Sequence, residues 1–355
     1  MIDSLTSLRW FCALYVYMFH IAIRIQPFPK ALIPVFDNGY VGMSFFFILS
    51  GFVLSLRYVD QNIDAATFIV DRLSRIYPAF LLAFIVTSPS FSTITHSPLY
   101  FLNAIFNIFL IQAWTPNLFP LGINSGMWSL SVEMFFYMLF PFILPFIVRA
   151  VAAGRRWYVA LFVLWLAAFL PGLIELVSPS DRAGLLYYYS SPIYRLPEFI
   201  VGVILGSAWR LNRLPGVNPV IVIGLGFVYL FSCYQYDGMA RQNQTLLNCV
   251  VVPFVSALLI YAARMRPGFL EVRPLVYLGE ISYGFYIYQF LFFGYIYGPA
   301  RGAIGDVGVT LLGIVITAAF ASISHHLLER PARRTIRYAW RHWGLTKGSI
   351  EAAQK

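Results

Sequence analysis

Long apolar stretches recur along the whole chain, and they constrain the fold more than any other feature. About 20 apolar residues are enough to cross a bilayer as a helix. The chain is 59% hydrophobic and only 11% charged, whereas soluble proteins are about a quarter charged. We therefore predict an all-α, polytopic integral membrane protein of about ten transmembrane helices, without a sizeable soluble domain. The predicted spans cover residues 5–26, 39–57, 74–94, 127–148, 157–174, 194–210, 218–236, 245–263, 276–297 and 307–328.

Basic residues between these spans predict the topology, because cytoplasmic loops carry an excess of Lys and Arg. All the basic clusters fall on one side if the N-terminus is cytoplasmic and the apolar run 99–114 does not cross the membrane. We therefore interpret 99–114 as a re-entrant or interfacial helix on the outer side, with an eleventh span as the alternative. Both termini are expected in the cytoplasm, and the net charge of +10 reflects topology rather than nucleic-acid binding. The basic clusters are 57–75, 149–156, 210–213, 264–273 and the chain after 329.

The first predicted span carries Arg9 and His20 in otherwise apolar sequence. It has no cationic leader and no cleavage site, so we expect it to be retained. Eleven residues at 100° each place the two side chains within about 20° of one another and roughly 16 Å apart along the helix. Ionisable side chains in membrane helices face the protein interior or a wet cavity, so this face predicts one wall of a transmembrane reaction channel. The alternative is an arginine that reaches the lipid headgroups and a histidine bound to a backbone carbonyl.

Two further arginines, Arg72 and Arg75, lie three residues apart on one helical face at the cytoplasmic start of the third span. Guanidinium groups pair bidentately with phosphate oxygens and keep their charge in a partly dry site. This pattern therefore indicates a site for a polyphosphate. The alternative is an ordinary positive-inside flank that Asp71 partly neutralises.

Polar residues at a helical spacing mark the start of the fourth span. Ser129, Glu133 and Tyr137 follow the i, i+4, i+8 spacing of a single stripe. A carboxylate inside a membrane helix needs a partner, and the topology places both Glu133 and His20 in the outer half of the bilayer. We predict that these two residues pair, and that Ser129 and Tyr137 lie on the acceptor side. The alternative is a Glu133 bonded to a tyrosine or a backbone group for structure alone.

Arg195 and Glu198 lie three residues apart at the outer entrance of the sixth span. They can pair with each other or bind a polar ligand on the acceptor side. Ser282, Tyr286 and Gln289 share one face of a later span, which we interpret first as inter-helix hydrogen bonding and second as a pocket wall.

The chain after residue 329 is basic and contains tryptophans. Such a segment is expected to lie on the anionic cytoplasmic leaflet, with binding of a phosphorylated ligand as the alternative. His325 and His326 are adjacent rather than four residues apart, and the three cysteines are isolated, so no metal site is expected.

Short motifs spread from residue 5 to about 334 carry a family resemblance. They are Arg9-x10-His20, FFFILSGF at 45–52, Arg72-x-x-Arg75 followed by IYP, WSLSVE at 128–133, RLPEFIVG at 195–202, LGEISYGFYIY at 278–288 and LLERPAR at 327–333. In this order and spacing they resemble the acyltransferase 3 family of integral-membrane acyltransferases. The chain departs from the common pattern at Thr6, Trp10 and Gln289, which bears on the identity of the acceptor.

The resemblance implies transfer of an acyl group, usually acetyl, from cytoplasmic acyl-CoA to a hydroxyl of an extracytoplasmic glycan or lipid-linked oligosaccharide. Exopolysaccharide and O-antigen are examples of such acceptors. By position, His20 would be the catalytic histidine, Glu133 its acidic partner, and Arg9, Arg72 and Arg75 residues of the donor site.

The resemblance also implies a bacterial cytoplasmic (inner) membrane protein that contacts membrane lipids and holds no permanent cofactor. We expect a membrane-embedded domain over 1–334 and a basic cytoplasmic tail over 335–355. Some members of the family carry an extracellular hydrolase-like domain. The tail is too short for one, so a stand-alone transferase is expected.

A hydroxyl is a poor nucleophile at neutral pH, and an imidazole within reach can accept its proton. We expect the thioester to reach His20 from inside and the acceptor from outside, with Glu133 stabilising the charged imidazole. An acyl-histidine intermediate is the other route. A hypothesis from another class is a transporter or flippase that uses the Arg, His and Glu as a relay. It needs repeats in inverted orientation, and the sequence shows none.

Overall fold

Helices form every regular element in the part of the chain that the structure describes, so the predicted all-α class is confirmed. The structure is a computed structural model that describes residues 2–91, 98–115, 125–154, 156–178, 182–235 and 245–353. The long helices are α1 (Asp3–Ala22), α3 (Gly42–Tyr58), α4 (Ala65–Phe91), α6 (Trp128–Ala152), α7 (Trp157–Val177), α9 (Pro192–Arg210), α10 (Pro219–Gln235), α11 (Asn248–Met265), α12 (Arg273–Leu291), α13 (Tyr297–Ser324) and α14 (Arg330–Ala353). Shorter helices are α2 (Ile33–Asp37), α5 (Pro98–Ile108) and α8 (Arg182–Ser190).

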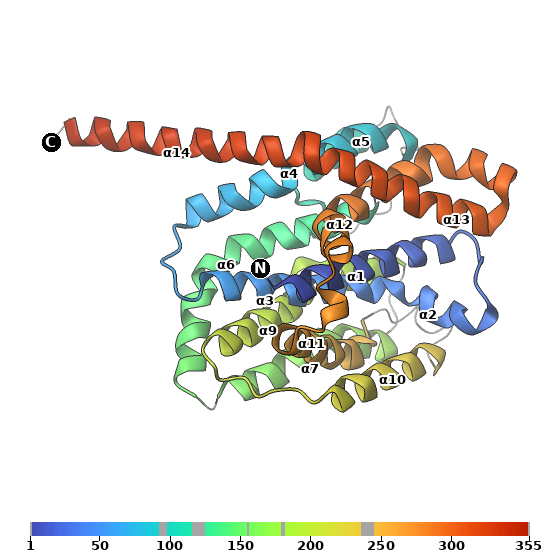
Figure 1. Ribbon diagram of the computed structural model, residues 1–355, viewed down its shortest axis with the longest axis horizontal. Coiled ribbons are helices and arrows are strands. Elements are labelled where there is room, and N and C mark those ends of the chain that lie inside the picture. The colour runs from blue at the N-terminus through green and yellow to red at the C-terminus, as the bar shows by residue number, and fades with distance from the viewer. Residues whose placement is uncertain are drawn as a thin grey trace.

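The long helices form an apolar bundle in which each predicted span overlaps one helix (Figure 1). By length and composition, five stretches of the described residues can cross a membrane. The structure therefore supports a membrane protein, and the total of about ten spans stays a prediction. The five stretches are Lys30–Tyr58, Trp128–Ala152, Trp157–Val177, Asn248–Met265 and Arg273–His342, the last of which contains several helices.

The segment 99–114 forms a short helix and a turn rather than a long helix. α5 has 11 residues and is followed by a 3₁₀ turn at Gln112–Trp114. Eleven helical residues rise about 16 Å, roughly half of the hydrocarbon thickness of a bilayer. Phe101, Ile105 and Phe109 are exposed along this segment. These features favour the interfacial or re-entrant interpretation over an eleventh span.

α3 and α9 pack with their backbones in contact in the centre of the bundle. A Cβ atom at Gly202 of α9 would lie 2.0 Å from the carbonyl oxygen of Ile48. One at Gly51 of α3 would lie 2.2 Å from the carbonyl oxygen of Phe199. Small residues permit such close helix contacts in membrane proteins. Gly51 and Gly202 therefore allow α3 and α9 to pack backbone to backbone.

Replacing Gly202 with alanine is expected to destabilise the bundle by about 1–3 kcal/mol, because the added methyl overpacks the contact between the two helices. The measurement is the unfolding midpoint of the detergent-solubilised protein. Gly224→Ala on α10 is the matched control, since a Cβ atom there meets no other atom within 4 Å. Equal midpoints for the two variants would contradict the packing described.

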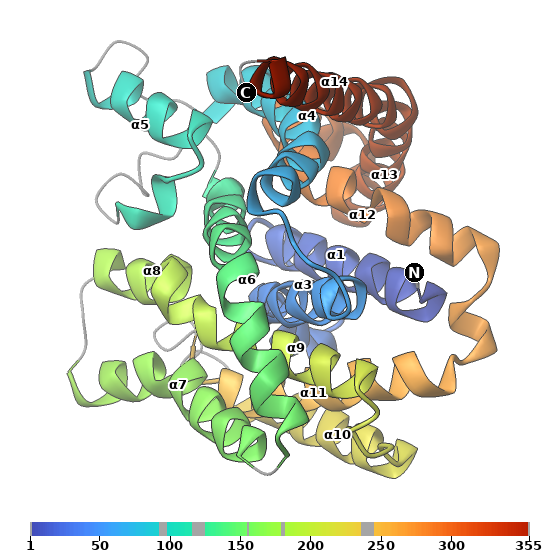
Figure 2. The ribbon, with the colours of Figure 1, turned by 90° about the vertical axis from the view of Figure 1, so that its left-hand side faces the viewer.

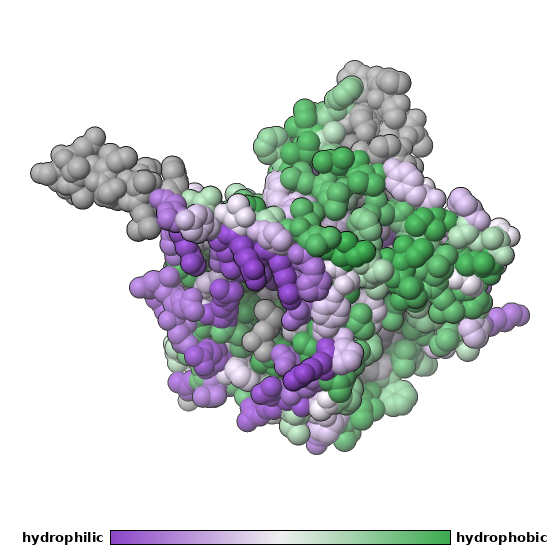
Figure 3. Space-filling view, turned by 45° about the horizontal axis from the view of Figure 1, so that its top comes forward, coloured by the Kyte–Doolittle hydropathy of each residue, from purple (hydrophilic) through white to green (hydrophobic). Residues whose placement is uncertain are grey.

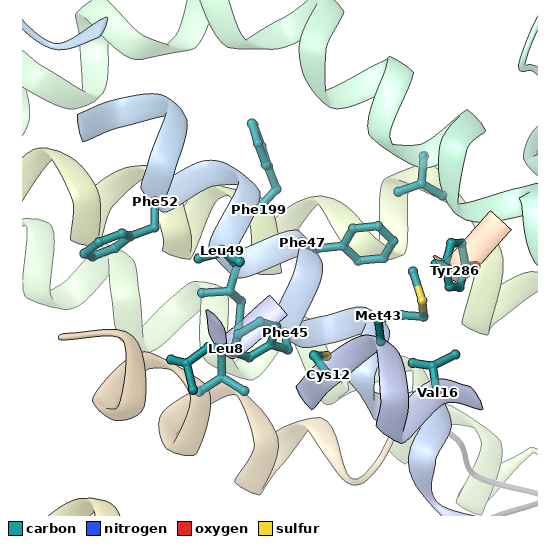
Figure 4. Packing of buried hydrophobic residues seen from close by; sticks show 14 of the residues in the cluster. Leu8, Cys12, Val16, Met43, Phe45, Phe47, Leu49, Phe52, Phe199 and Tyr286 are labelled. Atoms are coloured by element: carbon teal, nitrogen blue, oxygen red, sulfur yellow. The ribbon is translucent and has the colours of Figure 1, made fainter. Parts of the chain in front are cut away.

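One face of α1 packs on α3 and thereby orients the first helix. Figure 4 shows Leu8, Cys12 and Val16 of α1 along Leu49, Phe45 and Met43 of α3 in the buried core. Arg9 follows directly in the sequence, so its side chain leaves α1 about 100° around the helix from Leu8. The apolar contact with α3 thus turns the arginine toward a different part of the bundle.

The basic segments meet at one end of the molecule, which we call the basic end. It faces the viewer in Figure 2, and Figure 3 shows hydrophilic residues gathered beside α14. A shared end for these segments is what a positive-inside topology predicts. The contacts that join them are Arg210–Asp60 (2.7 Å), Arg213 to the carbonyl of Ala152 (3.4 Å), Arg264 to the carbonyl of Leu214 (3.3 Å) and Arg337–Asp71 (2.7 Å).

α14 runs without interruption through the predicted domain boundary between residues 334 and 335. It packs on α4, where the Nε1 group of Trp340 donates a hydrogen bond to Thr67 at 3.1 Å. The start of the tail is therefore part of the folded bundle and contacts protein as well as any membrane surface.

Candidate functional site

Two adjoining cavities lie beneath the basic end. The inner cavity has a volume of about 110 Å³ and the outer cavity about 340 Å³. Both are lined by Thr6, Arg9, Val53, Leu54, Arg72, Arg75 and Tyr283. The inner cavity alone is lined by Leu5, Met43, Phe46, Phe47, Leu49, Ser50, Ile76, Ser129, Leu130, Glu133, Tyr137, Ser282 and Tyr286. The outer cavity alone is lined by Asp3, Arg57, Val276, Glu280, His325, Glu329, Arg330 and Arg333.

Three arginines stand where the two cavities join. Arg9 comes from α1, and Arg72 and Arg75 come from α4. Within the described residues, none of the three has a carboxylate at ion-pair distance. Asp71, the expected neutralising group, pairs instead with Arg337 at 2.7 Å. The three arginines therefore converge on one place in the fold, and their role in binding a donor stays a prediction.

Arg72 is buried although its charge has no ionic partner. Its side chain is 4% exposed, and its Nε atom has no hydrogen-bond partner in the structure. The guanidinium carbon lies 5.5 Å from the ring centre of Phe68 and 5.9 Å from that of Tyr137. Such rings stabilise a cation only modestly. A buried, unpaired guanidinium that faces a cavity is suited to an anionic ligand.

The start of α4 is fixed just before these arginines. Asp64 precedes the helix, and its carboxylate accepts a hydrogen bond from the backbone N–H of Thr67 at 2.9 Å. This is the usual arrangement of a helix N-cap. Hydrogen bonds from the side chain and backbone of Thr67 lower the pKa of Asp64, so the cap persists at neutral pH. The helix therefore begins at a defined residue and carries Arg72 and Arg75 to the cavities in a fixed register.

The polar stripe of α6 lines the inner cavity, as its spacing predicted. The hydroxyl of Tyr137 donates a hydrogen bond to Glu133, and Ser50 of α3 donates another at 3.5 Å. Ser129 lies 3.0 Å from the hydroxyl of Tyr286 on α12. The stripe thus faces the same space as the three arginines, and the acceptor-side role of Ser129 and Tyr137 stays a prediction.

The predicted pair between Glu133 and His20 does not form in this structure. Glu133 is satisfied by its neighbours on α6 and α3, and the His20 ring packs against Phe290 and Phe293 at centroid distances of 5.1 and 6.3 Å. The carbonyl of His20 accepts a hydrogen bond from Arg24 at 2.6 Å. The expectation was wrong because it used only the depth of each residue in the membrane, whereas pairing also depends on which helices are neighbours.

His20 lies beyond the inner cavity and is not one of its lining residues. Phe290 follows Tyr286 by one turn of α12, and its ring packs against both His20 and Gly126. The cavities therefore reach from the basic end to the stripe of α6, with His20 on the far side of Phe290. A continuous transmembrane channel stays a prediction.

Arg195 and Glu198 form a buried ion pair instead of an open binding surface. They lie 3.0 Å apart and are 1% and 0% exposed. Ser44 accepts a hydrogen bond from Arg195 at 3.0 Å, and Asn248 donates one to Glu198 at 2.6 Å. Neither charged residue lines either cavity. Of the two interpretations, the pairing is the one that forms, and a role on the acceptor side stays a prediction.

The outer cavity contains residues that the sequence did not assign to a site. Arg57 ends α3, while Arg330 and Arg333 begin α14. Their signal was present in the basic cluster 57–75 and in the LLERPAR motif. It was interpreted as topology and as attachment to the membrane surface, because the sequence does not show that α14 folds back onto α4.

The face of α12 serves both of the uses considered for it. Ser282 and Tyr286 line the inner cavity, and the hydroxyl of Tyr286 hydrogen-bonds across helices to Ser129 of α6 at 3.0 Å. The amide of Gln289 donates a hydrogen bond within α12, to the carbonyl of Tyr286 at 2.7 Å. Gln289 itself is fully buried.

Comparison with known proteins agrees with these features. The family model of the acyltransferase 3 family, described as an acyltransferase domain, matches residues 2–326. The chain is 28% identical to the acyltransferase MdmB of Streptomyces mycarofaciens over 94% of this chain and 92% of that protein. It is 26% identical to the O-acetyltransferase OatA of Staphylococcus aureus over 94% of this chain, and it spans 57% of OatA. No solved structure matches. Since the family model covers nearly the whole chain, this protein belongs to the acyltransferase 3 family.

Proposed function

We propose that this protein transfers an acyl group, acetyl in the simplest case, from acyl-CoA bound at the basic end to a sugar hydroxyl presented on the opposite side of the membrane. The observation that carries the proposal is the group of unpaired arginines at the junction of the two cavities. The acyltransferase family and relatives named acyltransferase and O-acetyltransferase support the same reaction class.

The order of the residues along the two cavities matches the order of the chemical groups in acyl-CoA. Arginines bind phosphates bidentately, so Arg9, Arg72 and Arg75 would hold the diphosphate. The pantetheine arm is thin and largely uncharged, and the inner cavity beyond these arginines offers apolar walls such as Phe46 and Met43. The thioester would then lie at the inner end of this cavity, nearest to His20.

In the proposed reaction, the acceptor hydroxyl oxygen attacks the thioester carbonyl carbon and His20 takes the hydroxyl proton. The carbon–sulfur bond breaks, and the proton passes to the departing thiolate. An acyl-histidine intermediate is compatible with the same placement. Because Phe290 packs against His20, its ring has to move for the thioester to arrive. Glu133 belongs to the proposed catalytic group as the carboxylate that faces the donor.

The acceptor in this proposal is an extracytoplasmic polysaccharide such as exopolysaccharide or O-antigen, and the setting is the bacterial inner membrane. The meeting of the basic segments at one end supports a cytoplasmic position for that end and for both termini. Acyl-CoA is made in the cytoplasm, so a donor site at the basic end is on the side where the donor is present.

The test is a sided transfer assay in vesicles that hold the purified protein in one known orientation. With labelled acetyl-CoA on the side of the basic end and a polysaccharide acceptor on the other, we expect label on the polysaccharide. With donor and acceptor exchanged, transfer should fall to the level of protein-free vesicles. Equal transfer in both arrangements, or none in either, would contradict the proposal.

A further inference from the structure

We propose that the outer cavity contains a second phosphate subsite, formed by Arg57 and Arg333, which binds the 3′-phosphate monoester of the acyl-CoA nucleotide. The inference rests on the proposed function and deepens it. It assigns to the first turn of α14 a part in recognising the donor, in addition to any contact with lipid.

The charges around the outer cavity leave these two arginines free. Arg330 pairs with Glu280 at 3.3 Å, so its charge is already balanced. Glu329 accepts a hydrogen bond from the hydroxyl of Ser324 at 3.3 Å, and the ring of His325 lies 3.5 Å away. Within the described residues, Arg57 and Arg333 have no carboxylate at ion-pair distance, although Asp3 also lines the cavity. The guanidinium carbon of Arg57 lies 5.2 Å from the ring centre of Tyr58.

Arg333 lines the outer cavity although its Nε–H group has no hydrogen-bond acceptor. Its Nε atom is buried and has no hydrogen-bond partner in the structure. Desolvating a charged donor without a partner costs free energy. A bound phosphate oxygen would supply the missing acceptor, and a guanidinium is well shaped for it.

α14 is attached on both sides of this arginine, so the position of Arg333 is part of the fold. One turn later, Arg337 pairs with Asp71 of α4 at 2.7 Å. One turn earlier, Arg330 pairs with Glu280 of α12. α4 also carries Arg72 and Arg75, and these line the same cavity as Arg333. The two groups of arginines therefore face one continuous space.

The order of the subsites follows the order of the groups in coenzyme A. From the thioester, the molecule runs through the pantetheine arm and the diphosphate to a ribose that bears the 3′-phosphate. From the inner cavity, the walls run from apolar side chains through the junction arginines to Arg57 and Arg333. A ligand with phosphates at two separate places fits this arrangement better than one with a single phosphate group.

The experiment compares acetyl-CoA with acetyl-3′-dephospho-CoA, both as substrates and as ligands of the detergent-solubilised protein. For the wild-type protein we expect KM and Kd to be about ten-fold or more higher for the dephospho donor. Arg333→Ala should raise the values for acetyl-CoA by a similar factor and leave those for the dephospho donor nearly unchanged. Arg57→Ala should behave in the same way.

Arg334→Ala is the matched control, because Arg334 is exposed on the same helix and does not line the cavity. It should leave both donors unaffected. Arg333→Gln, which removes the charge but keeps a shorter polar side chain, guards against loss of fold. Repeating the measurements with and without phosphatidylglycerol separates a nucleotide phosphate from a lipid headgroup as the occupant.

The inference is overturned if the wild-type protein does not distinguish the two donors, or if Arg333→Ala weakens both equally. It is also overturned if the effect of the variant appears only with phosphatidylglycerol. A wild-type protein that neither binds nor uses either donor would instead overturn the proposed function, which is a separate result.

Discussion

The variant His20→Ala is expected to lower kcat for acyl transfer by about 10²–10⁴-fold, the range typical for loss of a general base. The ring lies beyond the inner cavity and packs against Phe290, and in the proposed reaction the acceptor hydroxyl meets the thioester there. Its removal leaves the arginine junction intact, so the Kd for acyl-CoA should stay the same. Initial rates with labelled acetyl-CoA and saturating polysaccharide measure kcat, and direct binding of acetyl-CoA measures Kd.

His326→Ala is the control for this prediction, because His326 is exposed, lines neither cavity and hydrogen-bonds to Tyr277. Its kcat should match the wild type. Arg72→Ala offers the opposite pattern, with a raised KM for the donor and a smaller change in kcat. Full transfer by His20→Ala would remove the histidine from the mechanism and leave Glu133 as the residue to test next.

Replacing Glu198 with alanine is expected to cost about 3–5 kcal/mol of stability, because it leaves the Arg195 charge buried without its partner. This is a large part of the 5–15 kcal/mol that typically stabilises a folded protein. Little folded protein should be recovered from the membrane. The measurement is the unfolding midpoint, or the monodisperse yield in detergent where no midpoint can be obtained.

The exposed ion pair between Arg301 and Asp306, 2.7 Å long with side chains 46% and 41% exposed, supplies the control. Arg301→Ala should cost no more than about 1 kcal/mol. The double variant Arg195→Met with Glu198→Leu should recover much of the stability, because it removes both charges together. A Glu198→Ala protein as stable as the wild type would show that this pair does not hold α9 in place.

Local spacing was enough to predict the groups that lie on one helix. Ser129, Glu133 and Tyr137 share a face, and so do Arg72 and Arg75, because a helix repeats every 3.6 residues. The same spacing predicted that Arg195 and Glu198 can pair. Family resemblance then indicated that the arginines of separate helices belong together, and Arg9, Arg72 and Arg75 do line the same two cavities.

The relations between helices could not be predicted in this way. The partners of Glu198 include Ser44 and Asn248, which lie 154 and 50 residues away. Glu133 and His20 were paired on depth alone, whereas α6 and α1 turn these two side chains toward different neighbours. The contribution of Arg333 depends on α14 folding back on α4, and no local pattern encodes that return.

The arginines at the cavity junction hold a portion of the donor that the reaction leaves unchanged. Free coenzyme A keeps every phosphate of acyl-CoA, so these arginines would bind the substrate acyl-CoA and the product coenzyme A with nearly equal affinity. Spent coenzyme A would therefore compete with fresh donor for the same arginines. The ratio of acylated to free coenzyme A in the cell, rather than the level of the acylated form alone, would then set the fraction of the enzyme that holds acyl-CoA.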